Sequence, residues 1–250
     1  MAKIISIHSF RGGTGKSNTT ANLAAYLASK GQRVGVIDTD IQSPGLHVLF
    51  ALDPSEVDKA LNDFLWGRCS IEQAAYDVTS RLGAAVDGKV FLIPSSLRTG
   101  EITRVLRDGY DVSLLHDGLR GLVEELALDT LLVDTHPGLN EETLLSIAVS
   151  DALIVILRPD QQDYQGTSVT VEVARSLEVP RILLVVNKTP ASFDHDDVRR
   201  RVAEAYDCEV ATVLPHSEEL MTLASAGVFI MRHPGLPLAA LYRQLGDQLL

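Results

Sequence analysis

The sequence predicts an α/β fold, a doubly wound, mostly parallel sheet with helices on both faces. Three observations support this prediction. An apolar run at residues 4–7 leads into a glycine-rich loop at residues 10–17, and a helical pattern follows at once. A second apolar run, residues 130–134, ends in an acid. Residues 151–157 and 181–186 are continuous apolar runs, as expected for parallel strands buried on both faces.

The remaining elements follow from hydrophobic periodicity and from turn signals. Strands are predicted at residues 3–8, 33–37, 89–94, 130–134, 151–157, 181–186 and 209–214. Helices are predicted at residues 18–30, 55–66, 70–76, 100–107, 112–126, 164–177 and 218–226. Because no linker, low-complexity tract or internal repeat interrupts this order, residues 1–250 are interpreted as a single domain.

The last helical pattern carries Leu238, Leu241, Leu245 and Leu249 on one face. An amphipathic helix of this kind could bind a membrane surface. Surface-binding helices are rich in Lys and Arg, however, and this one contains only Arg243. We therefore predict a core helix and expect no membrane-targeting tail.

Composition limits the function classes. The 250 residues are 46% hydrophobic, which is enough for a full core, and 33 acidic against 22 basic residues give a net charge of −11. This charge argues against strong bulk attraction to nucleic acid or anionic lipid, although it permits a local basic patch. With two isolated cysteines, no apolar run near 18 residues and no signal peptide, we expect a cytoplasmic protein without a transmembrane segment.

The glycine-rich loop is the strongest functional signal. Its glycines let backbone N–H groups converge on one point, and the following helix adds partial positive charge there. Lys16 supplies charge for the β- and γ-phosphates, and the Ser17 hydroxyl can ligate Mg²⁺. The alternative is a glycine-rich turn with an exposed lysine. The first glycine of the general motif is replaced here by Phe10. The predicted nucleotide-binding residues are Arg11, Gly12, Gly13, Thr14, Gly15, Lys16, Ser17 and Asn18.

The stretch Gly-Gly-Thr-Gly-Lys-Ser, followed by Thr-Thr-Ala-Asn-Leu-Ala at residues 19–24, resembles the phosphate loop of the MinD/ParA ATPases. The corresponding motif of that family is Lys-Gly-Gly-x-Gly-Lys-Ser/Thr, and the first lysine of this motif reaches the phosphates of a partner subunit. Arg11 stands at this position here. The resemblance implies ATP and Mg²⁺ as ligands, slow hydrolysis, an ATP-dependent homodimer, an activating or adaptor partner, and the positioning of a cargo such as a plasmid, the division machinery or an organelle.

Three aspartates stand at the ends of predicted strands. Asp38 and Asp40 come after the second strand, where helix capping is the simplest role for an aspartate, and Asp134 ends a later strand. By resemblance, Asp40 orients the attacking water. Asp134 ends a buried strand that follows a phosphate loop, and this order predicts that it joins the water shell of Mg²⁺. The expected metal set is therefore Ser17, Asp40 and Asp134, and the expected catalytic set is Arg11, Lys16 and Asp40. His136 occupies a place where the family has proline.

The base-binding residues are expected near Asn187-Lys188-Thr189-Pro190. A guanine site needs Asp at the last of these positions, and Pro190 cannot supply it. By resemblance Asn187 contacts adenine, and the stretch with Pro215 and His216 lines the adenine pocket. The alternative for Asn187 is a strand-end residue that caps a loop.

Three other functions are compatible with a loop of this class. A redox ATPase like the nitrogenase iron protein is rejected, because Cys69 and Cys208 lack the required positions. An amidoligase of the dethiobiotin-synthetase kind and a non-hydrolysing ATP-binding scaffold stay open.

One basic cluster, Arg199, Arg200 and Arg201, could bind DNA non-specifically and so associate the protein with the nucleoid. The competing interpretation is a solvated helix face, because Asp194, Asp196 and Asp197 precede the cluster. Whether DNA or a membrane serves as matrix is left open.

Overall fold

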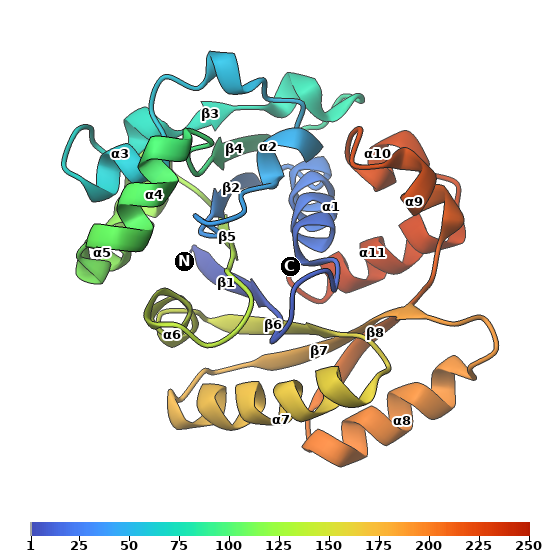
Figure 1. The fold of residues 1–250 in the computed structure, drawn as a ribbon. Coiled ribbons are helices and arrows are strands. Elements are labelled where there is room, and N and C mark those ends of the chain that lie inside the picture. The colour runs from blue at the N-terminus through green and yellow to red at the C-terminus, as the bar shows by residue number, and fades with distance from the viewer. Residues whose placement is uncertain (1) are drawn as a thin grey trace.

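The computed structural model describes residues 2–250, except for the side chains of Leu106, Asp108 and Val112. The described residues form one eight-stranded sheet in the order β3-β4-β2-β5-β1-β6-β7-β8, with β3 antiparallel to its neighbour and the other pairings parallel (Figure 1). The predicted fold class is therefore confirmed. The strands are β1 (Lys3–His8), β2 (Arg33–Asp38), β3 (Tyr76–Asp77), β4 (Lys89–Ile93), β5 (Thr130–Asp134), β6 (Ala152–Leu157), β7 (Ile182–Thr189) and β8 (Glu209–Pro215).

The helices lie between successive strands of the chain, except for the last three, which follow β8. They are α1 (Lys16–Ser29), α2 (Leu46–Leu49), α3 (Leu61–Leu65), α4 (Thr99–Asp108), α5 (Val112–Glu125), α6 (Glu141–Ala148), α7 (Gln161–Ser176), α8 (His195–Tyr206), α9 (Glu218–Leu223), α10 (Phe229–Arg232) and α11 (Pro237–Asp247). Short 3₁₀ turns lie at Pro54–Glu56, Glu72–Ala74 and Thr79–Leu82.

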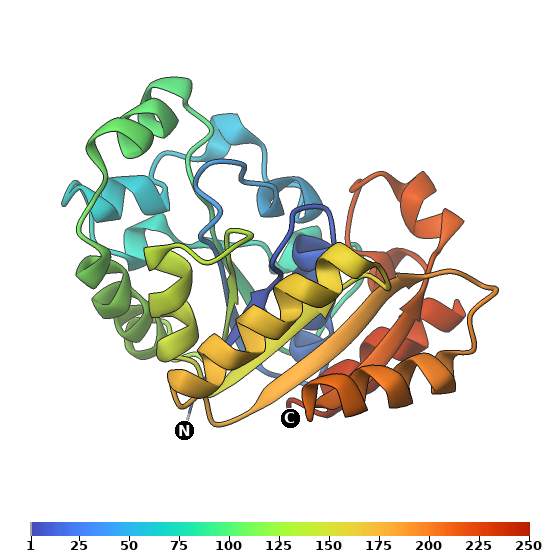
Figure 2. The same ribbon diagram turned by 60° about the horizontal axis from the view of Figure 1, so that its bottom comes forward.

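Side chains of the central strands alternate between two faces of the sheet. In β6, Ile154 and Ile156 pack with α1 and α11, whereas Leu153, Val155 and Leu157 pack on the opposite face with α7 and α8. Figure 2 shows α7 and α8 together on one side of the sheet. This two-sided burial explains why these strands are uniformly apolar in sequence.

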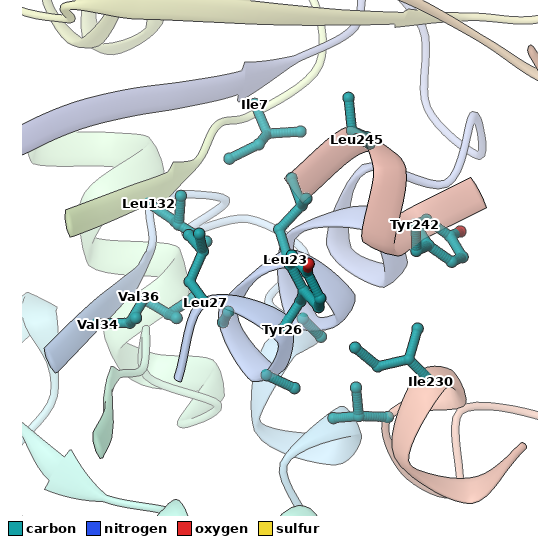
Figure 3. Close-up of a cluster of buried hydrophobic side chains, with 14 of the residues drawn as sticks. Ile7, Leu23, Tyr26, Leu27, Val34, Val36, Leu132, Ile230, Tyr242 and Leu245 are labelled. Atoms are coloured by element: carbon teal, nitrogen blue, oxygen red, sulfur yellow. The ribbon is translucent and has the colours of Figure 1, made fainter. Parts of the chain in front are cut away.

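Helix α1 is the centre of one core layer. Leu23 and Leu27 are fully buried against the sheet, and Tyr26 packs against Gly246 of α11, in the same core cluster as Tyr242 and Leu245 (Figure 3). The face of α11 that carries the leucines is thus packed in the core. The prediction that the last helix is a core helix is confirmed.

The parallel register places the acids that end β2 and β5 side by side at the carboxyl ends of the strands. Asp38 pairs with Asp134, and Asp134 pairs with Ile7 of β1, just before the glycine-rich loop. The loop and the acidic residues therefore meet at the carboxyl ends of three adjacent strands, which is where open α/β sheets bind ligands.

The sequence predictions were wrong between the second and fourth strands. The helix predicted at residues 55–66 is broken into a 3₁₀ turn and α3, because Asp53 rather than Ser55 caps the turn and Leu61 N–H donates to Pro94 O at 2.9 Å. The helix predicted at residues 70–76 is a 3₁₀ turn that leads into β3.

Helix α6 was missed, although its start carries a recognisable signal. Asn140 caps it by accepting the Thr143 N–H at 2.8 Å, and Glu141 and Glu142 occupy the first turn.

The close fit of α1 and α11 predicts a destabilising substitution. Gly246→Ala would place a Cβ overlapping Cδ1 of the buried Tyr26. Although alanine favours a helix over glycine by up to about 1 kcal/mol, overpacking typically costs about 1–3 kcal/mol. We expect a net loss in the free energy of unfolding measured in urea. Gly235→Ala, with no neighbouring atom within 4 Å, is the matched control; equal stability of the two variants would contradict the packing argument.

Candidate functional site

The glycine-rich loop needs glycine at two positions. Gly13 and Gly15 have φ values of 76° and 102°, and Gly15 directly precedes α1. Side chains rarely adopt such backbone, so these residues allow the loop to curl over the start of the helix. Lys16, the first residue of α1, is only 7% exposed. Its charge is thus held beside the loop rather than in bulk solvent.

The loop is also docked on α7. A Cβ added to Gly166 of α7 would overlap the ring of Phe10, so Gly166 makes room for the residue that replaces the first motif glycine. The Arg11 guanidinium lies 3.8 Å from Asp163 and 4.0 Å from Asp160. Figure 2 shows the loop after β1 beside the N-terminal end of α7. In this structure Arg11 therefore points to α7 of its own chain.

The Asp134 carboxylate joins β5 to α1. It accepts hydrogen bonds from Ser17 Oγ at 2.6 Å and Thr20 Oγ1 at 3.2 Å, and it is buried. Burial raises the pKa of Asp134, while Lys16 and the two hydroxyls favour the ionised form. A hydroxyl and a carboxylate are hard oxygen donors of the kind Mg²⁺ prefers. The donor set that the sequence predicted at Ser17 and Asp134 therefore fits this ion.

The two acids after β2 have different environments. Asp38 is buried and accepts backbone N–H groups from Asp40, Gly45 and Leu46 at 3.0–3.2 Å. Burial and the charge of Asp134 raise the pKa of Asp38. Asp38 therefore fixes the loop and the start of α2, which is the capping role considered above.

Asp40 instead lines the cavity beside the phosphate loop. Its Oδ1 accepts the Ser43 N–H at 3.1 Å and lies 3.8 Å from His136 Nε2. Burial raises the pKa of Asp40, and His136 and Lys16 oppose this shift. The other ring nitrogen of His136, Nδ1, lies 2.6 Å from Pro137 O, so it carries the proton and Nε2 faces Asp40.

A cavity of about 800 Å³ brings most of the predicted residues together. It is lined by Gly12, Gly13, Gly15, Lys16, Ser17, Asn18, Asp40, Asn187, Pro215 and His216. The lining does not include Thr14, Arg11 or Asp134. Thr14 is buried, the Arg11 guanidinium lies beside Asp163 of α7, and the Asp134 carboxylate accepts the Ser17 hydroxyl. The size suits a nucleotide.

Sequence reasoning missed several lining residues. Val48 of α2 and Met221 of α9 are exposed apolar residues, 48% and 65%, that line the cavity. Lys188 reaches the loop from β7. Lys188 was identified only as part of a base-binding stretch. Its left-handed backbone, φ 55°, has no signal in the sequence.

The side chains of the basic cluster on α8 are engaged with neighbouring groups of the same chain. Arg199 donates to Val210 O at 2.5 Å, Arg200 pairs with Asp197 at 2.5 Å, and Arg201 pairs with the same carboxylate at 2.8 Å. Arg200 also lies 3.4 Å from Glu204. These contacts favour the solvated helix face over a free basic patch. Within residues 2–250, none of the helices is both long and apolar enough to span a bilayer.

The buried His8, at the end of β1 just before the loop, should make the stability of the fold depend on pH in the acid range. Thr135 Oγ1 donates to Ile7 O, so it accepts from His8 Nδ1 at 2.8 Å, while His8 Nε2 is buried without a partner. Burial, helped by the charge of Lys16, lowers the pKa of His8 to about 3. The folded chain therefore keeps His8 neutral where the unfolded chain would protonate it.

The expected consequence is a loss of stability as the pH falls below 6.5, the pKa of an unperturbed histidine. In that range the unfolded state binds a proton that the folded state does not, which costs about 1.4 kcal/mol per pH unit. His8→Asn keeps a donor for Thr135 without a titrating ring. Its free energy of unfolding, measured from pH 7.5 to 5.5, should fall less steeply than the parent's. Parallel curves would mean that His8 binds its proton equally well in the folded and the unfolded chain.

Comparisons with known proteins place this geometry in a family. A family model described as an AAA domain matches residues 2–179, more than half of the chain. An uncharacterised ATP-binding protein of Methanocaldococcus jannaschii is 28% identical over 253 residues, covering 100% of this chain and 88% of the relative. The septum site-determining protein MinD of Bacillus subtilis is 25% identical over 262 residues, covering 100% and 90%.

An iron–sulfur cluster carrier protein of Pyrococcus horikoshii is also similar, at 24% identity over 256 residues, covering 98% of this chain and 84% of the relative. In this chain Cys69 packs with the core around α3 and α5, whereas Cys208 packs with the core around α7 and α8. The two thiols therefore do not converge within one subunit.

Among solved structures, the septum site-determining protein MinD of Pyrococcus horikoshii, complexed with Mg-ADP, has a TM-score of 0.82 at 21% identity and covers 100% of this chain and 96% of that one. This likeness concerns the fold. Together, the matching family model, the phosphate loop and the shared architecture show that the chain is an AAA-domain protein of the MinD/ParA family of P-loop NTPases.

Proposed function

We propose that this protein is a magnesium-dependent ATPase that forms a homodimer when it binds ATP and uses slow hydrolysis to position a cellular cargo. One observation carries the proposal: the phosphate loop, the Ser17–Asp134 pair and Asp40 meet at one cavity of about 800 Å³. Relatives whose names include ATP binding and septum-site determination support it.

In this proposal each residue has a separate task. Lys16 and the loop N–H groups neutralise the β- and γ-phosphates. Ser17 and Asp134 would hold Mg²⁺, and the bound ion would neutralise part of the phosphate charge. Asp40 lies in the cavity wall with one carboxylate oxygen on Ser43 N–H, so the other is available to orient a water molecule.

The base is proposed to be adenine. Asn187 Nδ2 donates to Thr14 O at 2.8 Å, and its Oδ1 accepts the Lys188 N–H at 2.8 Å, so one amide N–H is available for a ring nitrogen. Pro215 and His216 form the adjoining wall, held by the His216 N–H on Thr189 O at 2.9 Å. Because Pro190 offers no carboxylate to guanine, GTP should compete poorly with ATP.

A second candidate is an amidoligase that phosphorylates a small acid. It is favoured by a smaller cavity of about 200 Å³, lined by His47, Ser95 and Arg98 among others. Helix α2 contributes to both cavities, with His47 in the smaller one and Val48 in the larger one. Ser95 Oγ donates to Asp38 O at 2.7 Å, so the smaller cavity adjoins the Asp38–Asp40 loop. ATP turnover that requires an added carboxylate or amine would favour this candidate, whereas turnover by the protein alone would favour the ATPase.

The role of Asp40 gives a direct test. Asp40→Ala should keep ATP binding and the ATP-dependent dimer but lose most hydrolysis, because a water-positioning group acts on the transition state more than on binding. Phosphate release and gel filtration with Mg-ATP measure both properties. Lys16→Ala is the control and should lose ATP binding itself. Hydrolysis at the parent rate in Asp40→Ala would show that another group positions the water.

The role of Arg11 gives a second test. We expect Arg11 to leave Asp163 and Asp160 and to reach the partner's phosphates in the ATP dimer, since a guanidinium can bind phosphate oxygens bidentately. Arg11→Ala should then retain ATP affinity in the monomer but lose ATP-dependent dimerisation and most turnover.

Arg200→Ala, which removes another exposed arginine paired with acids, is the matched control for Arg11→Ala. Affinity is read by calorimetry and dimerisation by analytical ultracentrifugation. If Arg11→Ala dimerises as the parent does, its ion pairs with α7 are its only role and the cross-subunit assignment is wrong.

A further inference from the structure

Two neighbouring side chains at the end of β7 reach back to the phosphate loop. Asn187 Nδ2 donates to Thr14 O at 2.8 Å, and Lys188 Nζ donates to Gly13 O at 2.7 Å. The pair therefore contacts two successive carbonyls of the loop. Asn187 is also so close to the loop that a Cβ on Gly15 would overlap its Nδ2 atom.

The backbone of β7 is distorted at this point. Successive side chains of a regular strand point to opposite faces, so Asn187 and Lys188 could not both face one loop. The pairing of β7 with β8 shifts register between Val186 and Thr189, and Lys188 has a φ of 55°, a left-handed conformation that is unfavourable for a lysine. Local strain of this kind persists where the surrounding structure or function requires it.

The contacts matter because of how a phosphate loop binds anions. Its N–H groups must turn inward, which turns carbonyls such as Gly13 O and Thr14 O outward and leaves them in need of donors. An amide and an ammonium satisfy them here. Among the ion pairs of the described residues, none includes Lys188, so its charge is not neutralised by a carboxylate within 4 Å. This positive charge also lies beside the phosphate cavity.

We propose that Lys188 is a positioning residue that holds the phosphate loop in its anion-binding conformation, so that the affinity for nucleoside di- and triphosphates depends on its ammonium group. This inference rests on the proposed nucleotide site. It is separate from the Arg11 role, because Lys188 acts within one subunit on ADP and ATP alike. Arg11 is expected to act only in the ATP dimer.

The first measurement needs no nucleotide. In the ligand-free protein, Lys188→Met should increase amide hydrogen exchange of the peptide spanning residues 10–18, because Gly13 O loses its donor. Exchange of the β5 peptide, residues 130–134, is the internal control and should stay unchanged. Unaltered exchange at residues 10–18 would overturn the proposal.

The second measurement is ADP and ATP affinity by calorimetry. Lys188→Met should weaken both by about tenfold, the effect of losing one charge-assisted hydrogen bond. Lys188→Arg should recover part of the loss. In turnover, KM should change more than kcat, because contacts with the phosphates that are equal in ground and transition state affect KM.

Lys188→Gly separates positioning from general stability. Glycine removes the ammonium group but also relieves the strain of the left-handed backbone. The midpoint of thermal unfolding should therefore stay unchanged or rise while the affinity for ADP falls. A Lys188→Gly variant that binds ADP like the parent would overturn the proposal. If the parent binds neither ADP nor ATP while Lys188→Met still speeds exchange at residues 10–18, the loop contact stands and the ATPase function fails.

Discussion

The hydrogen bonds of Asp134 are the interaction on which the site depends. This buried carboxylate at the end of β5 accepts the hydroxyls of Ser17 and Thr20, and so joins the central sheet to the first turn of α1. A buried charge is tolerated only when it is paired and hydrogen-bonded, and Lys16 supplies the opposite charge. The position of α1, and with it the glycine-rich loop, is thereby coupled to the strand that carries the acid.

The sequence predicted those parts of the fold that local pattern determines. The bounds of β1 and β5 agree with the predicted ones, because each is an apolar run buried on both faces and closed by a polar residue. The region between β2 and β4 could not be predicted in the same way. There the backbone is held by distant partners, such as Leu61 N–H on Pro94 O, and such contacts override local helix preference.

The same division applies to the site. Residue types at fixed spacing predicted part of the cavity lining, because the register of parallel strands brings their carboxyl ends together. Side-chain direction was not predictable. Arg11 turns to α7 because Asp163 lies there, and Asn187 and Lys188 turn to the loop because β7 is distorted after Val186. Both depend on tertiary neighbours that the motif itself does not contain.

The glycine-rich loop is consequently held from two sides. On one side Phe10 packs on Gly166 and Arg11 pairs with Asp163; on the other, Asn187 and Lys188 bind loop carbonyls. A loop that is already ordered loses little conformational entropy when phosphate binds, so more of the contact energy becomes affinity. The two sides differ in one respect. The Arg11 side chain is half-exposed and lies 3.8 Å from Asp163, whose carboxylate is also paired with Arg158 at 2.9 Å, so the Arg11 contact can open at little cost. The Asn187 contact, in contrast, is buried. The arrangement thus permits Arg11 to move without disturbing the anion-binding backbone.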